Sequence, residues 1–221
     1  MKTNTNSNAY TIVYAAVMVV IVAFLLAFVS QALKSKQNAN VALDLKKQVL
    51  YSLNIRNLTN DKAEEAYAEI VKQEPNDLQT EKGNAYYTCI VDGKEIKVFP
   101  MKGMGLWGPI SGFLAVEDDD NTIYGAYFNH ESETAGLGAE IKDSRTWQEK
   151  FIGKKLHKEG VDGIALSVVK KVTDPDTQVD AVTGATLTSN GVNDMIKESL
   201  SGLAEQTECP STLDNSETEN T

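Results

Sequence analysis

The stretch Asp180-Ala181-Val182-Thr183-Gly184-Ala185-Thr186-Leu187-Thr188-Ser189 stands directly before a predicted helix. It combines four hydroxyl side chains with a Gly-Ala pair, whose uncovered backbone lets N–H groups approach an anion closely. Thr188 or Ser189 is a suitable N-cap for the helix. The apolar stripe of that helix consists of Val192, Met195, Ile196, Leu200 and Leu203. Thr186 is therefore expected just outside a helix N-terminus, where the partial positive charge favours a phosphate.

The pattern Asp-x-x-(Ser/Thr)-Gly-Ala-Thr-x-Thr in this stretch resembles the flavinylation motif of FMN-binding domains, in which the Thr after Gly-Ala carries FMN through a phosphoester. Two further segments match the same family in the same order. They are residues 105–112 (Gly-Leu-Trp-Gly-Pro-Ile-Ser-Gly) and residues 130–138 (His-Glu-Ser-Glu-Thr-Ala-Gly-Leu-Gly). With an apolar N-terminal segment added, the chain is similar to the family of the C subunit of the Na⁺-translocating NADH:quinone oxidoreductase. Ala135 departs from the usual family Pro, and residues 130–133 contain one added residue, so no role is carried over to His130.

The resemblance implies a set of FMN-binding residues. Thr186 is the covalent acceptor, and Trp107 and Leu137 cover the two faces of the isoalloxazine ring. Glu133 and Thr134 match a Glu-Thr pair beside the flavin. The other expected contacts are Gly136, Lys170, Asp180, Thr183, Gly184, Ala185 and Thr188, where Lys170 matches a family lysine only across a small alignment gap.

Plainer interpretations of four of these residues stay open on the sequence alone. Trp107 can be a core residue, although a tryptophan between glycines is also suited to covering a planar ring. Glu133 can belong to a solvated loop, and Lys170 can be a solvated strand residue. Thr186 alone can be an ordinary neighbour of a helix cap.

The sequence predicts an electron carrier rather than a complete enzyme. It shows no nucleophile beside a base, no metal-binding box and no Rossmann fingerprint, so no catalytic residue or metal ligand is expected. By the resemblance, electrons from NADH reach this FMN through iron–sulfur centres and pass to another flavin and to quinone, coupled to Na⁺ export. The implied partners are the other subunits of a membrane respiratory complex and a flavin transferase that uses FAD.

Two alternative functions remain at this stage. The G subunit of the related Rnf ferredoxin:NAD⁺ oxidoreductase shares an anchor and a Thr-linked FMN, but residues 105–110 and a helical pair before the sheet favour the quinone-reducing complex. The alternative from a different class is a membrane-tethered binding module without a cofactor, in which the Thr motif is only a helix entry.

Composition excludes some partners. The 221 residues carry a net charge of −10 without a Lys/Arg block, which argues against nucleic acid. Cys89 and Cys209 are too few and too far apart for a metal site or a disulfide framework. Cys89 alternates with apolar residues and is expected to be buried.

Residues 12–29 carry no charge and can span a membrane as a helix, since eighteen residues reach ~27 Å of a ~30 Å hydrocarbon core. A cleaved signal peptide is the rival, but the apolar run exceeds the usual ~7 to 15 residues. Four lysines follow the span and one precedes it, so the positive-inside rule would leave the large domain in the cytoplasm. The resemblance instead implies a single-pass protein of the bacterial inner membrane with its flavin domain in the periplasm.

The rest of the chain predicts an α+β fold with a twisted, mainly antiparallel sheet flanked by helices. Helices are expected over residues 42–53 and 63–71, with Asn60 as the cap of the second, and another from Gly136 through Phe151. Strands are expected over residues 86–91, 95–99, 113–116, 122–128 and 164–172. Asp92-Gly93 supplies a tight turn, and the acidic run before residue 122 is expected to be a solvated turn rather than a cation loop.

The expected domain organisation has four parts. They are an N-terminal tail (1–9), a transmembrane helix (10–33), an FMN-binding domain (34–205) and a polar, disordered tail (206–221).

Overall fold

The computed structural model describes residues 8–75 and 85–204, so the polar tail and Cys209 lie outside the described residues. The chain divides between Leu45 and Lys46 into an N-terminal unit and a larger compact unit. The first unit contains most of α1 (Asn8–Ser52), whose last residues, from Lys46 on, belong to the compact unit. α1 is long and apolar enough to cross a membrane, and its most apolar part has no buried residue. The separate helix expected over residues 42–53 was wrong, because it is the end of α1. Residues 8–52 contain neither Gly nor Pro, so nothing in the sequence interrupts the helix.

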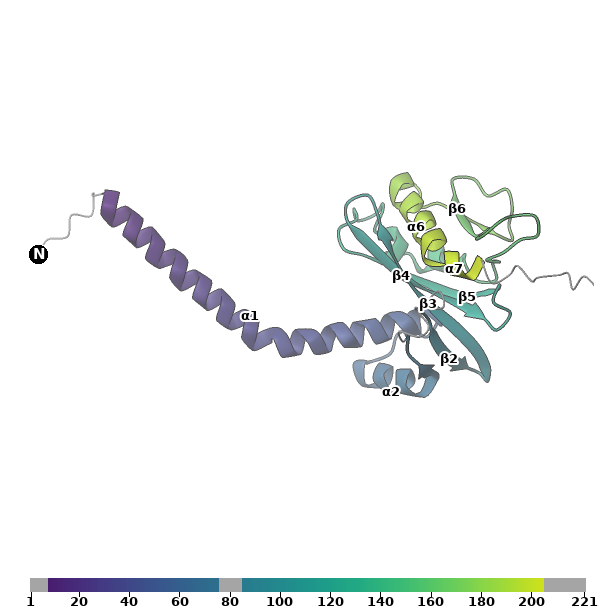
Figure 1. Ribbon diagram of the computed structural model, residues 1–221, viewed down its shortest axis with the longest axis horizontal. Helices are drawn as coiled ribbons and strands as arrows, with labels where there is room; N and C mark the ends of the chain where they lie inside the picture. The colour runs from purple at the N-terminus through teal and green to yellow at the C-terminus, as the bar shows by residue number, and fades with distance from the viewer. Residues whose placement is uncertain (1–7, 76–84, 205–221) are drawn as a thin grey trace, which may run out of the picture. The chain divides into compact units, whose positions relative to one another are not determined.

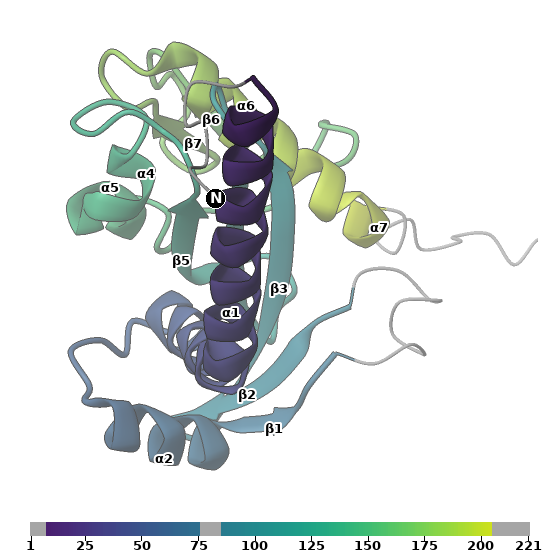
Figure 2. The ribbon, with the colours of Figure 1, turned by 90° about the vertical axis from the view of Figure 1, so that its left-hand side faces the viewer.

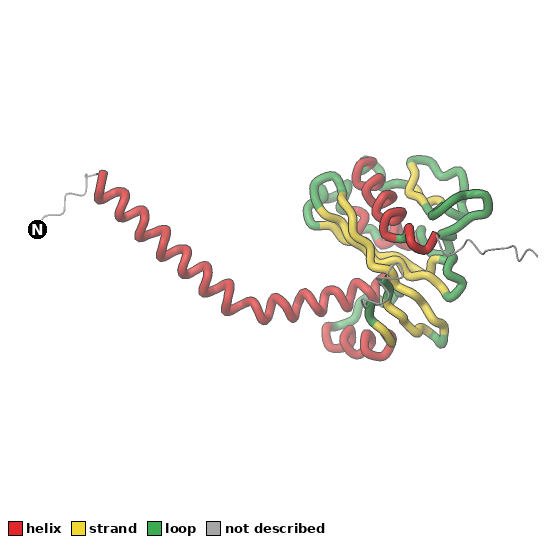
Figure 3. Tube along the Cα trace, viewed as in Figure 1, coloured by secondary structure: helices red, strands yellow, loops and turns green. Residues whose placement is uncertain are grey.

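A five-stranded antiparallel sheet forms the centre of the compact unit, and its strands are drawn in yellow in Figure 3. This confirms the α+β class with a mainly antiparallel sheet. The strand over residues 71–73 was not predicted, because residue 71 was expected in a helix, and residues 164–172 do not join this sheet. Its strands follow in chain order: β1 (Val71–Gln73), β2 (Tyr87–Val91), β3 (Lys94–Met104), β4 (Pro109–Glu117) and β5 (Ile123–His130). Asp92 and Gly93 have φ values of 51° and 80°, which confirms the tight turn between β2 and β3. The acidic run forms the turn between β4 and β5, where the Asp119 carboxylate accepts the N–H groups of Asn121 and Thr122 at 3.0 and 2.7 Å.

Helices cover both faces of this sheet (Figure 1). Successive strand residues point to opposite faces. Phe128 belongs to the core cluster that also contains the buried residues of α6 (Thr186–Ser199), whereas Tyr127 contacts Tyr51 of α1 with ring centroids 5.3 Å apart. α2 (Asn60–Ile70) lies beside β1 and β2, and its cap is Thr59 rather than the predicted Asn60. The Asn60 side chain instead accepts a hydrogen bond from Lys47 at 2.7 Å.

Cys89 in β2 is fully buried, as predicted. Burial raises the pKa of its thiol to about 12, because the thiolate would lose its hydration. The thiol is therefore neutral and unreactive in the folded protein.

Two short helices follow β5 where the sequence predicted a single one. α4 (Glu140–Asp143) ends at Ser144, whose hydroxyl accepts the N–H of Trp147 and so caps α5 (Arg145–Glu149). Both helices lie beside β5 (Figure 2). The Trp147 ring packs against Phe128 and Phe151 at centroid distances of 5.4 and 5.2 Å, which anchors this segment to the core.

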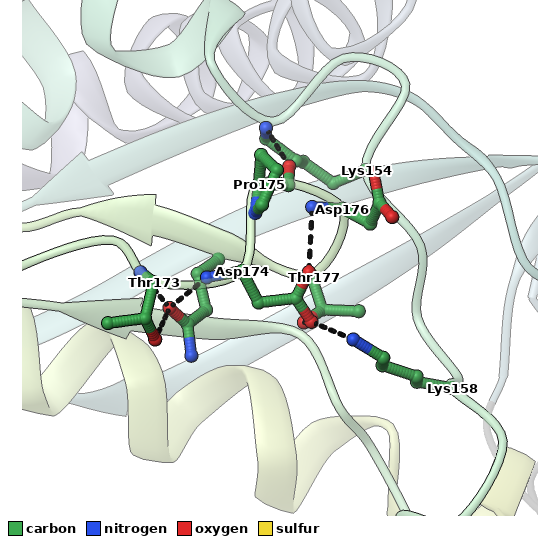
Figure 4. A network of polar contacts seen from close by, with 8 residues as sticks. Lys154, Lys158, Thr173, Asp174, Pro175, Asp176 and Thr177 are labelled. Carbon is green, nitrogen blue, oxygen red and sulfur yellow. Dashed lines mark hydrogen bonds and ion pairs between the residues drawn. The ribbon is translucent and has the colours of Figure 1, made fainter.

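A second, parallel sheet precedes α6. It pairs β6 (Ser167–Val169) with β7 (Gln178–Asp180), so the strand predicted over residues 164–172 is shorter and its partner was not predicted. Polar side chains close the connection between the strands (Figure 4). The Asp174 carboxylate accepts hydrogen bonds from Lys158 at 2.6 Å and from the Thr177 hydroxyl at 2.8 Å. This loop therefore fixes the start of β7, which leads into the Thr186 segment.

α6 packs its predicted stripe on the sheet. Val192, Met195, Ile196 and Leu200 are buried, and Leu203 of α7 (Ser201–Ala204) is partly buried against the same core. The first turns of α6 lie against the end of β3, and Gly191 makes this close approach possible, because a Cβ there would collide with the carbonyl oxygen of Met104.

Gly191→Ala should therefore destabilise the protein, although alanine is favoured over glycine by roughly 1 kcal/mol in a free helix. We expect a loss of about 1 to 3 kcal/mol, the usual cost of overpacking. Urea unfolding of the two proteins measures it. Equal or greater stability of the variant would show that α6 has room to move away from β3.

Candidate functional site

A tight turn presents Thr186 at the surface. The N–H of Ala185 donates to the carbonyl of Val182 at 3.1 Å, and Gly184 between them has a φ of 78°, which favours glycine. Thr186 is exposed and is the first residue of α6, not a residue outside the helix as predicted.

The N-cap of α6 is Ala185, whose side chain makes no capping hydrogen bond, so the predicted caps Thr188 and Ser189 were wrong. Both side chains are buried and bonded elsewhere. The Ser189 hydroxyl accepts the N–H of Val182 at 3.1 Å, and the Thr188 hydroxyl donates to Glu133 at 2.6 Å. The first N–H groups of a helix have no partner inside it, so this N-terminus is suited to hold an anion esterified at Thr186.

Glu133 joins two segments that the sequence analysis placed at the same site. Its side chain is buried rather than solvated, which excludes the plainer interpretation. One carboxylate oxygen accepts the backbone N–H of Trp107 at 2.9 Å, and the other accepts the Thr188 hydroxyl. The Glu133 N–H donates to Nδ1 of His130 at 3.2 Å. The carboxylate therefore lies between the β3–β4 turn and α6.

Large apolar side chains are exposed around Thr186. Trp107 is 66% exposed and Leu137 is 42% exposed, so neither is the core residue that a plain interpretation allowed for Trp107. Leu137 lies directly beside the turn that precedes α6, since a Cβ on Gly184 would be 2.8 Å from its Cδ2. Exposed apolar surface of this kind on connecting turns is typical of a ligand site.

Three exposed apolar residues of this region were missed by the sequence analysis: Met104, Leu106 and Leu187. Leu187 stands off the helical stripe that begins at Val192, and Leu106 lies between Gly105 and Trp107 in the glycine-rich turn. These two sequence positions could have identified Leu187 and Leu106 as exposed apolar residues of the site.

The parallel sheet brings Lys170 and Asp180 to one edge. Lys170 follows β6 and Asp180 ends β7, and the carboxyl ends of parallel strands meet at the same edge. Lys170 is exposed. The Asp180 carboxylate is bound by Lys150 Nζ at 2.8 and 3.0 Å, and its carbonyl accepts the Trp147 indole N–H at 2.8 Å. Asp180 thus anchors the start of the motif to α5.

An open pocket of about 260 Å³ lies beside this anchor. Its lining includes Gly136, Lys150, Asp180 and Thr183, which connects two of the sequence-predicted segments. Thr134 is exposed in the loop before Gly136. Most of the predicted residues therefore lie on the turns around the start of α6, and Glu133 and Thr188 are buried beneath that surface. Lys170 lies directly after the end of β6.

Known proteins are similar to this chain in sequence and in fold. Residues 105–201 match the model of the FMN-binding domain family. The C subunit of a Na⁺-translocating NADH-quinone reductase from Neisseria meningitidis serogroup A is 44% identical over 124 residues, which cover 53% of this chain and 47% of the relative. The protein of the same name from Vibrio alginolyticus is 37% identical over 134 residues, 59% of this chain and 52% of the relative. The matched part of the chain thus spans about half the length of these relatives.

A solved structure matches over more of the chain. The crystal structure of the C subunit of a Na⁺-translocating NADH-quinone reductase from Parabacteroides distasonis superposes with a TM-score of 0.69 at 36% identity. The match covers 77% of this chain and 94% of the solved one.

Proposed function

Because the chain belongs to the family of the C subunit of the Na⁺-translocating NADH-quinone reductase, we propose that it carries FMN esterified to Thr186 and relays electrons from NADH toward quinone in such a complex. The observation that carries the proposal is the exposed Thr186 hydroxyl at an uncapped helix start, beside the exposed side chains of Trp107 and Leu137. FMN supplies one-electron chemistry that no amino-acid side chain in this site offers.

The residues present fit this cofactor. Thr186 holds the phosphate at the positive end of α6, whose N-terminus has no side-chain cap, and the helix dipole there favours its negative charge. Trp107 and Leu137 offer apolar surface to the ring and limit its contact with water. Asp180, one of the proposed FMN contacts, also holds the turn before α6 in place through Lys150 and Trp147. The protein thus binds, orients and shields the group that carries the electron.

Attachment requires a separate flavin transferase that uses FAD. In that reaction the Thr186 oxygen forms a bond to the FMN phosphorus, the pyrophosphate bond of FAD breaks, and AMP leaves. The test is the mass of the full chain made with and without the transferase. We expect a gain of the mass of FMN less water on the peptide that contains Thr186, only with the transferase. An unmodified peptide in both samples would refute the proposal.

The proposed location is the bacterial inner membrane, with α1 as a single-pass anchor and the flavin domain in the periplasm. The positive-inside rule favoured a cytoplasmic domain because four lysines follow the span. That argument is weaker in the structure, because two of these lysines belong to the compact unit. Lys46 pairs with Glu64 at 3.6 Å, and Lys47 donates to Asn60. They are part of a folded surface rather than a free juxtamembrane cluster.

Removing residues 1–33 should convert the protein into one that is soluble without detergent, because the apolar part of α1 has no buried residue and the compact unit has its own core. Ultracentrifugation of membranes from cells that make either form measures the change. A full-length chain whose mature N-terminus lies near Gln31 would contradict the anchor, since it would show a cleaved signal peptide.

Family membership favours the quinone-reducing complex over the Rnf alternative. A tethered module without cofactor would give a colourless protein even in the presence of the transferase, so absorbance in the visible range separates it from both flavoproteins.

A further inference from the structure

Glu133 occupies an unusual position beneath the candidate site. It is buried, yet its carboxylate receives hydrogen bonds only from neutral donors, the backbone N–H of Trp107 and the Thr188 hydroxyl, among the residues that the structure describes. Trp107 lies on the β3–β4 turn and Thr188 on α6, so one side chain connects segments that are far apart in the sequence.

The surrounding backbone is shaped around this carboxylate. A Cβ on Gly105 would collide with Oε1 of Glu133, and a Cβ on Gly138 would collide with Oε2 and with the Thr188 hydroxyl. The backbone therefore approaches the carboxylate from two sides, in the β3–β4 turn and in the loop that carries Glu133, at positions where any side chain would collide with it. A side chain that only filled a gap in the packing would not need a glycine on each side of its carboxylate.

We propose that Glu133 is the positioning residue of the site: it holds the turn that carries Trp107 against the first turn of α6, which carries Thr186. This deepens the proposed function, on which it rests. We call Glu133 and its two hydrogen bonds, to the Trp107 N–H and the Thr188 hydroxyl, the Glu133 clamp. Hydrogen bonds to a charged acceptor are stronger than those between neutral groups, so this clamp can fix an otherwise exposed turn. Trp107 and the attachment residue would then keep a constant separation while the cofactor changes its charge.

The first measurement uses the flavin-free full chain in detergent, labelled with ¹⁵N-tryptophan. The sequence has two tryptophans, so two backbone amides are observed, and Trp147 is the internal control. Glu133→Ala should speed hydrogen exchange of the Trp107 amide by about ten- to a hundredfold, the value of a lost charged hydrogen bond. Glu131→Ala, at an exposed neighbouring carboxylate, should leave this rate unchanged.

Thr188→Val tests the clamp from its other end. Valine keeps the shape of threonine but cannot donate to Glu133, so exchange at the distant Trp107 amide should also become faster. In a Glu133→Ala background the same substitution should add nothing to that rate. If Thr188→Val leaves the Trp107 amide unchanged in a folded protein, Glu133 does not couple the two segments and the proposal is wrong.

Glu133→Gln separates geometry from charge in the flavin-loaded chain. Glutamine can accept the Trp107 N–H and donate to the Thr188 oxygen, so exchange should stay near that of the original protein. The flavin reduction potential should rise, because a buried negative charge that opposes electron uptake is gone. Glu131→Gln should shift it less, since water screens that position. An unchanged potential, or a Trp107 amide exchanging as fast as in Glu133→Ala, would overturn the assignment.

The readouts also distinguish this proposal from the function on which it rests. If no flavin attaches to the original chain, the function fails while the exchange rates still report on the clamp. If flavin attaches to Thr186 but substitutions of Glu133 and Thr188 leave the exchange rate of the Trp107 amide unchanged, the proposed function is supported and the clamp proposal is wrong.

Discussion

Thr186→Ala should abolish covalent flavin in protein made together with the transferase. The substitution removes the only side-chain oxygen that the first residue of α6 offers, and it leaves the helix intact because alanine is a good helix former. We expect no flavin fluorescence under ultraviolet light in a denaturing gel and no added mass on the peptide. In membranes that hold the rest of the complex, NADH-dependent quinone reduction should fall to background.

Thr183→Ala is the matched control, because Thr183 is an exposed hydroxyl of the same turn. It should keep the adduct, as should Thr186→Ser, which retains a hydroxyl at the attachment position. The buried Thr188 is unsuitable as a control, since its hydroxyl is bonded to Glu133. An adduct that survived Thr186→Ala, or that mapped to Thr183, would show that the attachment site was assigned wrongly.

The antiparallel part of the fold could be predicted from the sequence because its signals are local. Asp92-Gly93 defines one hairpin, and the acidic run before Thr122 defines another, each between β-rich segments. The stripe of α6 is equally local, since residues at helical spacing share one face. The predicted strands were mostly too short, because propensity does not show how far pairing continues; β3 reaches Met104 rather than Phe99.

Features that depend on distant partners could not be predicted. The sequence around Thr188 and Ser189 has the composition of a helix cap, but tertiary contacts with Glu133 and Val182 bury both hydroxyls, and the helix begins earlier. Three-residue strands such as β6 and β7 carry little pattern of their own. The burial of Glu133 depends on Gly105 of the β3–β4 turn and on Gly138 of its own loop, and single-sequence reasoning treats such glycines only as turn residues.

The two tryptophans should respond to alanine substitution in opposite ways. Trp107 is 66% exposed, so Trp107→Ala should change the free energy of unfolding by no more than about 0.5 kcal/mol. Trp147 is 4% exposed and packs against Phe128 and Phe151, so Trp147→Ala should cost about 3 to 5 kcal/mol. Urea unfolding followed by circular dichroism gives both values.

Trp107→Ala, which should change stability little, should have a large effect on the properties of the flavin. Trp107→Ala should leave attachment at Thr186 largely intact, because the ester depends on the turn before α6 and not on the β3–β4 turn. It should nevertheless change the visible spectrum and the reduction potential, since loss of the indole surface exposes the ring to water. Leu106→Ala, on the same turn, is the matched control for a general loosening of that loop and should have a smaller effect. If Trp107→Ala unfolds the protein, or leaves both spectrum and potential unchanged, the indole does not cover the ring, and Leu137 and Leu187 become the candidates for that contact.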